Sequence, residues 1–252
     1  MKKKFQYLDT DAPIAFAHRG GAFDAPENSM AAFQSAVNIG YRYLETDVHL
    51  TSDGKVIAFH DHVLDRVTNM SGKIAEMPYS LIQNALIAEQ SPIPLLEELL
   101  EAFPEARFNI DPKDDRVVGP LSEIIASTDS ADRICVASFS DKRTREVSRL
   151  VGKRLCTGVG PSGVTRLRLG KLPLRLTRIS GECVQVPLTV AGVPLITPLF
   201  VQRVHSVGKV IHAWTINDEE KMHHLIDIGV DGIMTDKPNL LKSVLTEHGL
   251  WY

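Results

Sequence analysis

The 252-residue sequence has few cysteines and few aromatic residues. Cys135, Cys156 and Cys183 are odd in number, lie far apart in apolar segments and form no CxxC pair. This pattern argues against a disulfide framework and gives no sign of a thiolate zinc site. We therefore expect three small buried residues in a reducing compartment.

An excess of charge of one sign is also missing. The 28 basic and 31 acidic residues leave a formal net charge of −3, so the whole protein has no attraction for nucleic acid. Any anion binding must therefore be local. The 44% of hydrophobic residues suits a globular protein with a sizeable core.

The sequence has no simple membrane span. Residues 1–9 begin with basic residues but lack the apolar region of a signal peptide. The uncharged stretch 183–202 is interrupted by Pro187, Pro194 and Pro198, and an interior proline costs a helix about 3 kcal/mol. We expect a cytoplasmic location.

Short apolar runs alternate with helical patterns along the whole chain. The expected parallel strands are 14–18, 43–49, 107–111, 134–137, 154–157, 184–186, 210–214 and 232–235. The expected helices are 29–39, 94–102, 116–127, 142–151, 198–207, 219–228 and 239–248. Eight strands with interleaved helices and no linker predict an α/β fold, a single (β/α)8 TIM barrel spanning residues 1–252.

One interval breaks this alternation. Residues 51–91 contain a turn, a short strand at 56–59 and a polar excursion before the next helix. We interpret this interval as a small insertion after the second barrel strand. Loops after barrel strands build the active-site face, so substrate contacts are expected here.

Reactive residues follow several of these strands. His18 and Arg19 end the first strand, where a histidine beside a guanidinium can combine proton transfer with phosphate neutralisation. Gly20 and Gly21 would let a ligand approach the backbone closely. The alternative is a capping turn with a surface arginine.

The second strand carries a group of acids. Its alternation sends Glu45, Asp47 and His49 to one side, with His49 expected to point past the site. Two buried carboxylates repel one another and are costly to desolvate, so a hard divalent cation is their natural compensation. An exposed strand edge is the weaker alternative.

Three further residues complete the candidate site. His60 follows the short inserted strand and could face His18 across the barrel mouth, where two histidines can act as base and acid. Asp111 and Lys113 share one side at the end of the third barrel strand. Asp111 would add an oxygen ligand and Lys113 a positive charge.

Together these residues resemble the glycerophosphodiester phosphodiesterase family. The resemblance depends on HRGG at 18–21, PENS at 26–29, ETD at 45–47, DGKVIAFHD at 53–61, LDRVTN at 64–69 and DGIMTDKP at 231–238. It covers essentially the whole chain. It implies a TIM barrel that hydrolyses glycerophosphodiesters to glycerol 3-phosphate and an alcohol, usually with Mg²⁺ or Ca²⁺.

The resemblance also implies roles for individual residues. His18 and His60 match the family's acid/base pair, and Glu45 and Asp47 match its metal ligands. Asp111 stands where the family usually has glutamate, one methylene longer. The remaining matches are substrate-binding: Arg19 and Lys113 as phosphate contacts, Glu27 at the start of a helix and Trp214 in the pocket.

Glu27 and Trp214 have structural alternatives. Glu27 could simply favour the positive end of a helix, at which Asn28 or Ser29 could be the N-cap. Trp214 could be a core residue.

A basic, leucine-rich stretch lies in the second half. Residues 147–181 contain no Asp or Glu but have eight Lys and Arg residues, a composition found in segments that touch anionic lipid. The alternative is a solvated barrel helix. Membrane contact would favour a lysophospholipid substrate, and thus a lysophospholipase D; a third hypothesis is a non-catalytic barrel that binds phospholipid head groups.

Overall fold

The computed structural model describes residues 5–170 and 179–251. The main sheet follows the order β8-β7-β6-β2-β1-β13-β12-β9, and all neighbouring pairs along it are parallel. The strands are β1 (Ile14–Ala17), β2 (Tyr43–Leu50), β6 (Arg107–Pro112), β7 (Ile134–Val136), β8 (Cys156–Thr157), β9 (Cys183–Val186), β12 (Val210–Ala213) and β13 (Gly232–Thr235). The predicted (β/α)8 barrel is confirmed, with each strand close to its expected position.

The barrel closes between β8 and β9 with little backbone pairing. These two strands are joined by one parallel bridge between Gly158 and Cys183 rather than by a ladder. Two backbone bonds accompany it, from the Val159 amide to the Cys183 carbonyl at 2.7 Å and from the Glu182 amide to the Thr157 carbonyl at 2.7 Å. We call this junction the β8–β9 seam.

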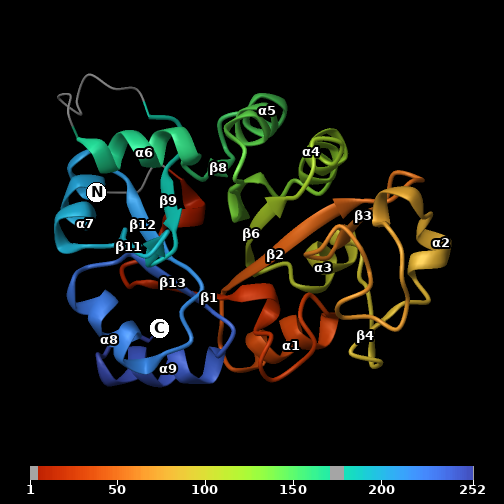
Figure 1. Cartoon of the computed structure of the whole chain (residues 1–252), viewed down its shortest axis with the longest axis horizontal. Helices are drawn as coiled ribbons and strands as arrows, with labels where there is room; N and C mark the ends of the chain where they lie inside the picture. Colours follow the sequence, from red (N-terminus) through yellow and green to blue (C-terminus); the bar gives the residue numbers. More distant parts are fainter. Residues whose placement is uncertain (1–4, 171–178, 252) are drawn as a thin grey trace.

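Helices surround the outside of the sheet (Figure 1). They are α1 (Met30–Asn38), α3 (Leu96–Ala102), α4 (Val118–Ser127), α5 (Asp141–Val151), α6 (Pro161–Leu169), α7 (Pro198–Ser206), α8 (Glu219–Asp227) and α9 (Pro238–Glu247). Single-turn 3-10 helices also occur at η1 (Gln6–Leu8), η2 (His18–Gly20), η3 (Ile74–Glu76) and η4 (Ala131–Arg133). All the α-helices of this ring except α6 lie where periodicity predicts a helix.

Side-chain caps explain several helix starts. The Ser29 hydroxyl accepts a hydrogen bond from the Ala32 amide at 3.1 Å and so caps α1. Ser140, Thr197 and Asp218 cap α5, α7 and α8 in the same way. Of the two capping residues considered for α1, Ser29 is therefore the cap, which leaves the side chain of Asn28 free for another role.

The interval after β2 forms a small substructure. Strand β3 (Val56–Ala58) pairs antiparallel with β2, and the chain continues through α2 (Tyr79–Ile82) and the short pair β4 (Leu86–Ile87) and β5 (Ser91–Pro92). Figure 1 shows α2 and β4 at the right, beside β3 and away from the centre of the barrel. This interval buries its own apolar cluster, which includes Ile57, Phe59, Leu64, Ile74, Ile82 and Ile93.

The barrel interior is filled at the amino-terminal ends of the strands. Phe16, Tyr43 and Met234 pack there with the three cysteines, against Phe5, Tyr7 and Leu8 of the N-terminal segment. A larger cluster, which includes Leu44 and Ile110, lies between the sheet and the helices. The carboxyl ends of the strands are thereby left open for a site.

Some cations of the basic stretch 147–181 have acidic partners. Arg149 pairs with Glu146 at 2.6 Å, and Arg154 pairs with Asp129 and Asp132 at 2.7 and 2.5 Å. The absence of Asp and Glu from 147–181 suggests that its eight cations are unopposed, and this is wrong for these two. Glu146 lies one turn before Arg149 in α5, and Asp129 and Asp132 of the segment after α4 lie beside Arg154. Residues 171–178 of the stretch lie outside the described residues.

Within residues 5–170 and 179–251, no helix has the length and apolar composition needed to cross a membrane. Near the stretch 183–202, the structure instead has β9, the hairpin of β10 (Thr189–Val190) and β11 (Val193–Pro194), and the start of α7.

Candidate active site

A cavity of about 420 Å³ lies at the carboxyl ends of the barrel strands. Eight of the nine predicted site residues line it: His18, Arg19, Glu45, Asp47, His60, Asp111, Lys113 and Trp214. Glu27 does not. The other side of the cavity is mainly apolar, formed by residues such as Phe139, Val159, Val164, Val190 and Leu195.

The turn after β1 presents His18 and Arg19 to the cavity. Arg19, Gly20 and Gly21 all have positive φ angles. A Cβ on Gly20 would lie 2.8 Å from Ala32 Cβ, and one on Gly21 would collide with Pro238. The expectation that these glycines admit a ligand is therefore wrong, since both are buried and allow close packing on α1 and α9.

His18 is oriented by an aspartate. Its Nδ1 lies 2.6 Å from Asp236 Oδ1, and the amide of the Asn217 side chain donates to Asp236 Oδ2 at 2.7 Å. Burial lowers the pKa of His18, but Glu45 and the hydrogen bond to Asp236 outweigh it, so the pKa is raised. With Nδ1 held, Nε2 is the nitrogen available for proton transfer.

His60 is oriented in a similar way from the opposite side. Its Nδ1 lies 2.5 Å from Asp61 Oδ1, and its backbone carbonyl lies 3.0 Å from His49 Nε2. Arg66 Nε donates to the other Asp61 oxygen at 2.5 Å. His49 is buried behind the site, as predicted, and does not line the cavity.

Glu45 and Asp47 are buried side by side on β2 but differ in their partners. Burial, followed by the charge of Asp47, raises the pKa of Glu45 to about 7. Burial also acts to raise the pKa of Asp47, yet Lys113 and then Arg19 hold it below its usual value. The nearest cationic side chain to Glu45 in the described residues is His18, with Nε2 at 3.8 Å.

Lys113 bridges two of the acids. Its Nζ lies 2.7 Å from Asp47 Oδ1 and 3.0 Å from Asp111 Oδ2. The parallel register of β2 and β6 places Asp47 directly beside Asp111, which explains why one ammonium reaches both. Burial raises the pKa of Asp111 despite Lys113.

Glu27 forms ion pairs with two arginines beside the cavity. Its Oε1 lies 3.0 Å from Arg19 Nη1 and 2.7 Å from Arg66 Nη2. Glu27 thus links the arginine next to His18 with the arginine that holds Asp61. Its predicted contact with substrate stays a prediction.

Trp214 follows β12 and lies at the wall of the cavity. Its ring packs edge to face with Phe139 at a centroid distance of 5.7 Å. Phe139 is 69% exposed, so this pair lies at the rim of the cavity. Trp214 itself is half-buried and also packs on the apolar cluster inside the barrel, so it combines the pocket position with the core-packing alternative.

We predict that Arg66→Gln lowers stability in a pH-dependent way. Burial opposes the change, but Arg66 and His60 lower the pKa of Asp61 from 3.8 to about 2. A depressed carboxyl pKa stabilises the fold above the unfolded pKa, and this contribution is lost as pH falls through the folded pKa. The loss should be about 1 kcal/mol at pH 7, after solvent screening, and roughly half of that at pH 3.

Urea unfolding of both proteins between pH 3 and pH 7 measures this difference. Arg149→Gln is the matched control, because it removes an exposed pair within one helix, and it should change stability less. A loss for Arg66→Gln that is the same at every pH would contradict the role given to Asp61.

Three positioning residues were missed by the sequence analysis. Asp236 and Asp61 belong to quoted motifs, but contact with the two histidines depends on strand β13 lying beside β1 and on one local turn. Asn28, buried and at a φ of 56°, donates to Asp47 Oδ2 at 3.5 Å and accepts from Thr46 at 2.8 Å. The sequence signal that could have identified Asn28 is its position directly before the serine that caps α1.

Comparison with known proteins identifies the family. Residues 18–240 match the Glycerophosphoryl diester phosphodiesterase family. A probable glycerophosphodiester phosphodiesterase 2 of Mycobacterium tuberculosis is 38% identical over 98% of this chain and 96% of its own. A lysophospholipase D of Rattus norvegicus is 29% identical over 97% of this chain and 88% of its own.

Solved structures share the fold. A phosphodiesterase of Oleispira antarctica, in complex with the product sn-glycerol-3-phosphate, superposes with a TM-score of 0.80 at 23% identity, covering 93% of this chain and 97% of its own. A putative glycerophosphoryl diester phosphodiesterase from Silicibacter pomeroyi has a TM-score of 0.80 at 22% identity, over 98% and 100% of the two chains. With the match along residues 18–240 and the 38% identical relative, these findings show that the chain belongs to the glycerophosphoryl diester phosphodiesterase family and is a phosphoric diester hydrolase.

Proposed function

We propose that the cavity hydrolyses glycerophosphodiesters to glycerol 3-phosphate and an alcohol, with His18 and His60 as the acid/base pair and a divalent cation as cofactor. The observation that carries this proposal is the pair of histidines in one cavity, each with Nδ1 on an aspartate. Mere binding of a head group does not require two oriented imidazoles.

A divalent cation fits the acids of the cavity. Glu45, Asp47 and Asp111 offer carboxylate oxygens, which Mg²⁺ and Ca²⁺ prefer. Glu45 is buried and accepts a hydrogen bond from the Arg19 backbone amide at 3.0 Å, but among the described residues it has no ion pair with a Lys or Arg side chain. A cation beside it would relieve the repulsion that raises its pKa. When bound, such an ion supplies charge stabilisation for the phosphoryl oxygens.

The three carboxylates do not form one tight oxygen cluster in the described part of the chain. An ion held there would therefore complete its coordination with water, as Mg²⁺ usually does in proteins. We propose Mg²⁺ or Ca²⁺ as the ion.

The side chains of the chain itself account for the proton transfers. One histidine begins neutral and takes the proton of the attacking group, which is either water or the glycerol hydroxyl of the substrate. The other histidine begins protonated and gives its proton to the departing alcohol. Where the glycerol hydroxyl attacks, a water then opens the resulting cyclic phosphate to give glycerol 3-phosphate. Arg19 and Lys113 contribute positive charge for the phosphoryl oxygens.

The direct test is a product assay with purified protein. Glycerophosphocholine and a divalent cation should yield glycerol 3-phosphate and choline, whereas the His18→Ala protein should yield neither at a comparable rate. Binding of glycerophosphocholine without turnover would instead support the non-catalytic barrel.

A lysophospholipase D activity is the second candidate, and the apolar wall of the cavity favours it. Val190 and Val193 of the β10–β11 hairpin are 55% and 59% exposed, and Phe139 is exposed beside Trp214. An acyl chain leaving the cavity on this side would cover these side chains. The 29% identical lysophospholipase D is a relative with this activity in its name.

We predict that Val190→Asn raises the KM for a short-chain lysophosphatidylcholine severalfold and leaves the KM for glycerophosphocholine unchanged. The reason is that Val190 lines the apolar side of the cavity, away from the phosphate-binding cations. Steady-state kinetics below the micelle concentration measures both values. Lys55→Asn on a distant exposed turn is the control; equal effects of Val190→Asn on both substrates would remove the acyl-chain contact.

We also propose a cytoplasmic enzyme whose residues 1–252 act as one phosphodiesterase barrel, with 51–91 as an insertion that brings His60 to the cavity. Transient contact of 147–181 with a membrane surface is part of this proposal. Arg166 and Arg168 near the exposed Leu169 support it, while the paired Arg149 and Arg154 do not.

A further inference from the structure

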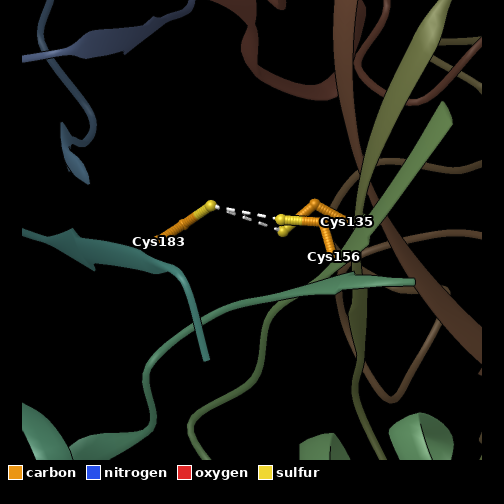
Figure 2. A group of neighbouring side chains, drawn as sticks. All are labelled: Cys135, Cys156 and Cys183. Carbon is orange, nitrogen blue, oxygen red and sulfur yellow. Dashed lines mark hydrogen bonds between the residues drawn. The ribbon is translucent and has the colours of Figure 1, made fainter. Parts of the chain in front are cut away.

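Three cysteines meet inside the barrel, at the end opposite to the active site. Cys135 comes from β7, Cys156 from β8 and Cys183 from β9, and each side chain is fully buried. Figure 2 shows the sulfur of Cys183 pointing toward those of Cys135 and Cys156 across the interior. Sequence spacing gave no sign of this meeting, because it arises from strands that are neighbours in the ring.

The sulfur atoms have the spacing of metal ligands. The Sγ of Cys183 lies 3.6 Å from that of Cys156 and 3.9 Å from that of Cys135, and all three lie within 4.8 Å of one another. Three sulfurs bound to one zinc ion at about 2.3 Å in tetrahedral geometry would be roughly 3.8 Å apart. A disulfide needs a separation of about 2.05 Å, so the arrangement is that of three free thiols around a common point.

A buried hydroxyl without a partner lies in the same packed cluster. Tyr7 is 0% exposed, and within the described ranges its hydroxyl has no hydrogen-bond partner. Burial, followed by the neighbouring thiols of Cys135 and Cys183, raises the pKa of this hydroxyl. A buried donor left unpaired is costly, and thiolates beside it would accept its hydrogen bond.

The cluster also has a source of positive charge. Arg107 donates to the Tyr43 hydroxyl at 2.5 Å, and its guanidinium lies 5.3 Å from the centre of the Tyr43 ring, which packs on Tyr7. A zinc ion with three thiolates carries a net charge of −1. One guanidinium at the edge of the cluster offsets that charge, which makes burial of the complex less costly.

The position of the three cysteines in the barrel also favours a bound ion. The three cysteines lie on both sides of the β8–β9 seam, where one bridge replaces a ladder. An ion bound to all three sulfurs would tie β7, β8 and β9 together at this thin junction.

We propose that Cys135, Cys156 and Cys183 bind one Zn²⁺ ion as thiolates, and that the Tyr7 hydroxyl donates a hydrogen bond to one of these thiolates. Binding forms three Zn–S bonds and releases three thiol protons to the solvent. Because the site is closed by the N-terminal segment, the ion enters while the chain folds. This site is separate from the carboxylates of the cavity in both place and ligand type.

Cobalt provides the test, since Co²⁺ bound by thiolates has a sulfur-to-metal charge-transfer absorption that carboxylates cannot give. The full chain would be produced in minimal medium with Zn²⁺ or Co²⁺ and purified with excess Mg²⁺ to occupy the carboxylate site. We expect one Zn²⁺ or Co²⁺ per chain, the charge-transfer band, and a melting temperature several degrees above that of metal-free protein.

Cys183→Ala and Cys156→Ala are the test variants, and Ser122→Ala, at a buried serine of helix α4, is the matched control. Each cysteine variant should lose the metal and the band while keeping glycerophosphocholine hydrolysis, which also shows that it folds. Tyr7→Phe should keep the band but lower metal retention. Wild-type protein without the band, or with no more metal than the cysteine variants, would overturn the proposal and leave the cysteines as core residues.

Discussion

Replacing either His18 or His60 with alanine should lower kcat/KM for glycerophosphocholine by about 10²-fold or more, the usual loss of a general acid or base. Both rings line one cavity, and each has its Nδ1 held by an aspartate. The double variant should lose much less than the product of the two single losses, because both groups serve one transition state. The pH profile of kcat/KM should be bell-shaped for the wild type.

Substrates with different leaving groups distinguish the histidine that acts as general acid from the one that acts as general base. A substrate with an acidic leaving group such as p-nitrophenol needs little protonation, so it should restore only the variant that lacks the acid. His62→Ala is a matched control, since His62 packs on His49 at a ring distance of 4.8 Å and does not line the cavity. Equal rescue of both variants, or of neither, would contradict the division of labour.

Removal of the divalent cation should abolish turnover. EDTA should reduce the rate to background and Mg²⁺ or Ca²⁺ should restore it, while Asp47→Ala should lose at least about 10²-fold, a loss of the size expected for an electrostatic group at the reaction centre. Rates measured on metal-stripped and reloaded protein give the result.

Two variants make this test specific. Asp53→Ala removes an exposed acid of the inserted turn and should leave the rate unchanged. Asp111→Glu should keep activity, because glutamate is the residue that the family resemblance implies there. Full activity after exhaustive chelation, or an unchanged rate in Asp47→Ala, would remove the metal from the mechanism.

Much of the fold could be predicted because each barrel strand is short, apolar and separated by a helical pattern. Helix α6 was absent from the expected helices and entered only as the barrel-helix alternative for 147–181. Pro161 and Gly163 at its start look like loop residues, although proline at the first helical position is favourable. Inside the insertion, α2 and the β4–β5 pair are too short for periodicity to detect.

The candidate site was predictable where chemistry follows a strand end, as for Glu45, Asp47 and Lys113. What the sequence could not show is which residues from distant strands touch. Asp236 meets His18 because β13 lies beside β1, and the cysteines meet because β7, β8 and β9 are neighbours. These contacts depend on which strands are neighbours in the barrel and on their register. Residue spacing along the sequence gives neither.

The two histidines lie on parts of the molecule that pack on different apolar clusters. His18 follows a strand of the barrel, whereas His60 is carried by a segment that packs on its own apolar cluster. Local opening of that segment would take one imidazole out of the cavity without unfolding the barrel. Amide hydrogen exchange in residues 56–95 would then report the fraction of molecules that are catalytically competent, and inactivation by mild denaturant would come before the loss of global structure.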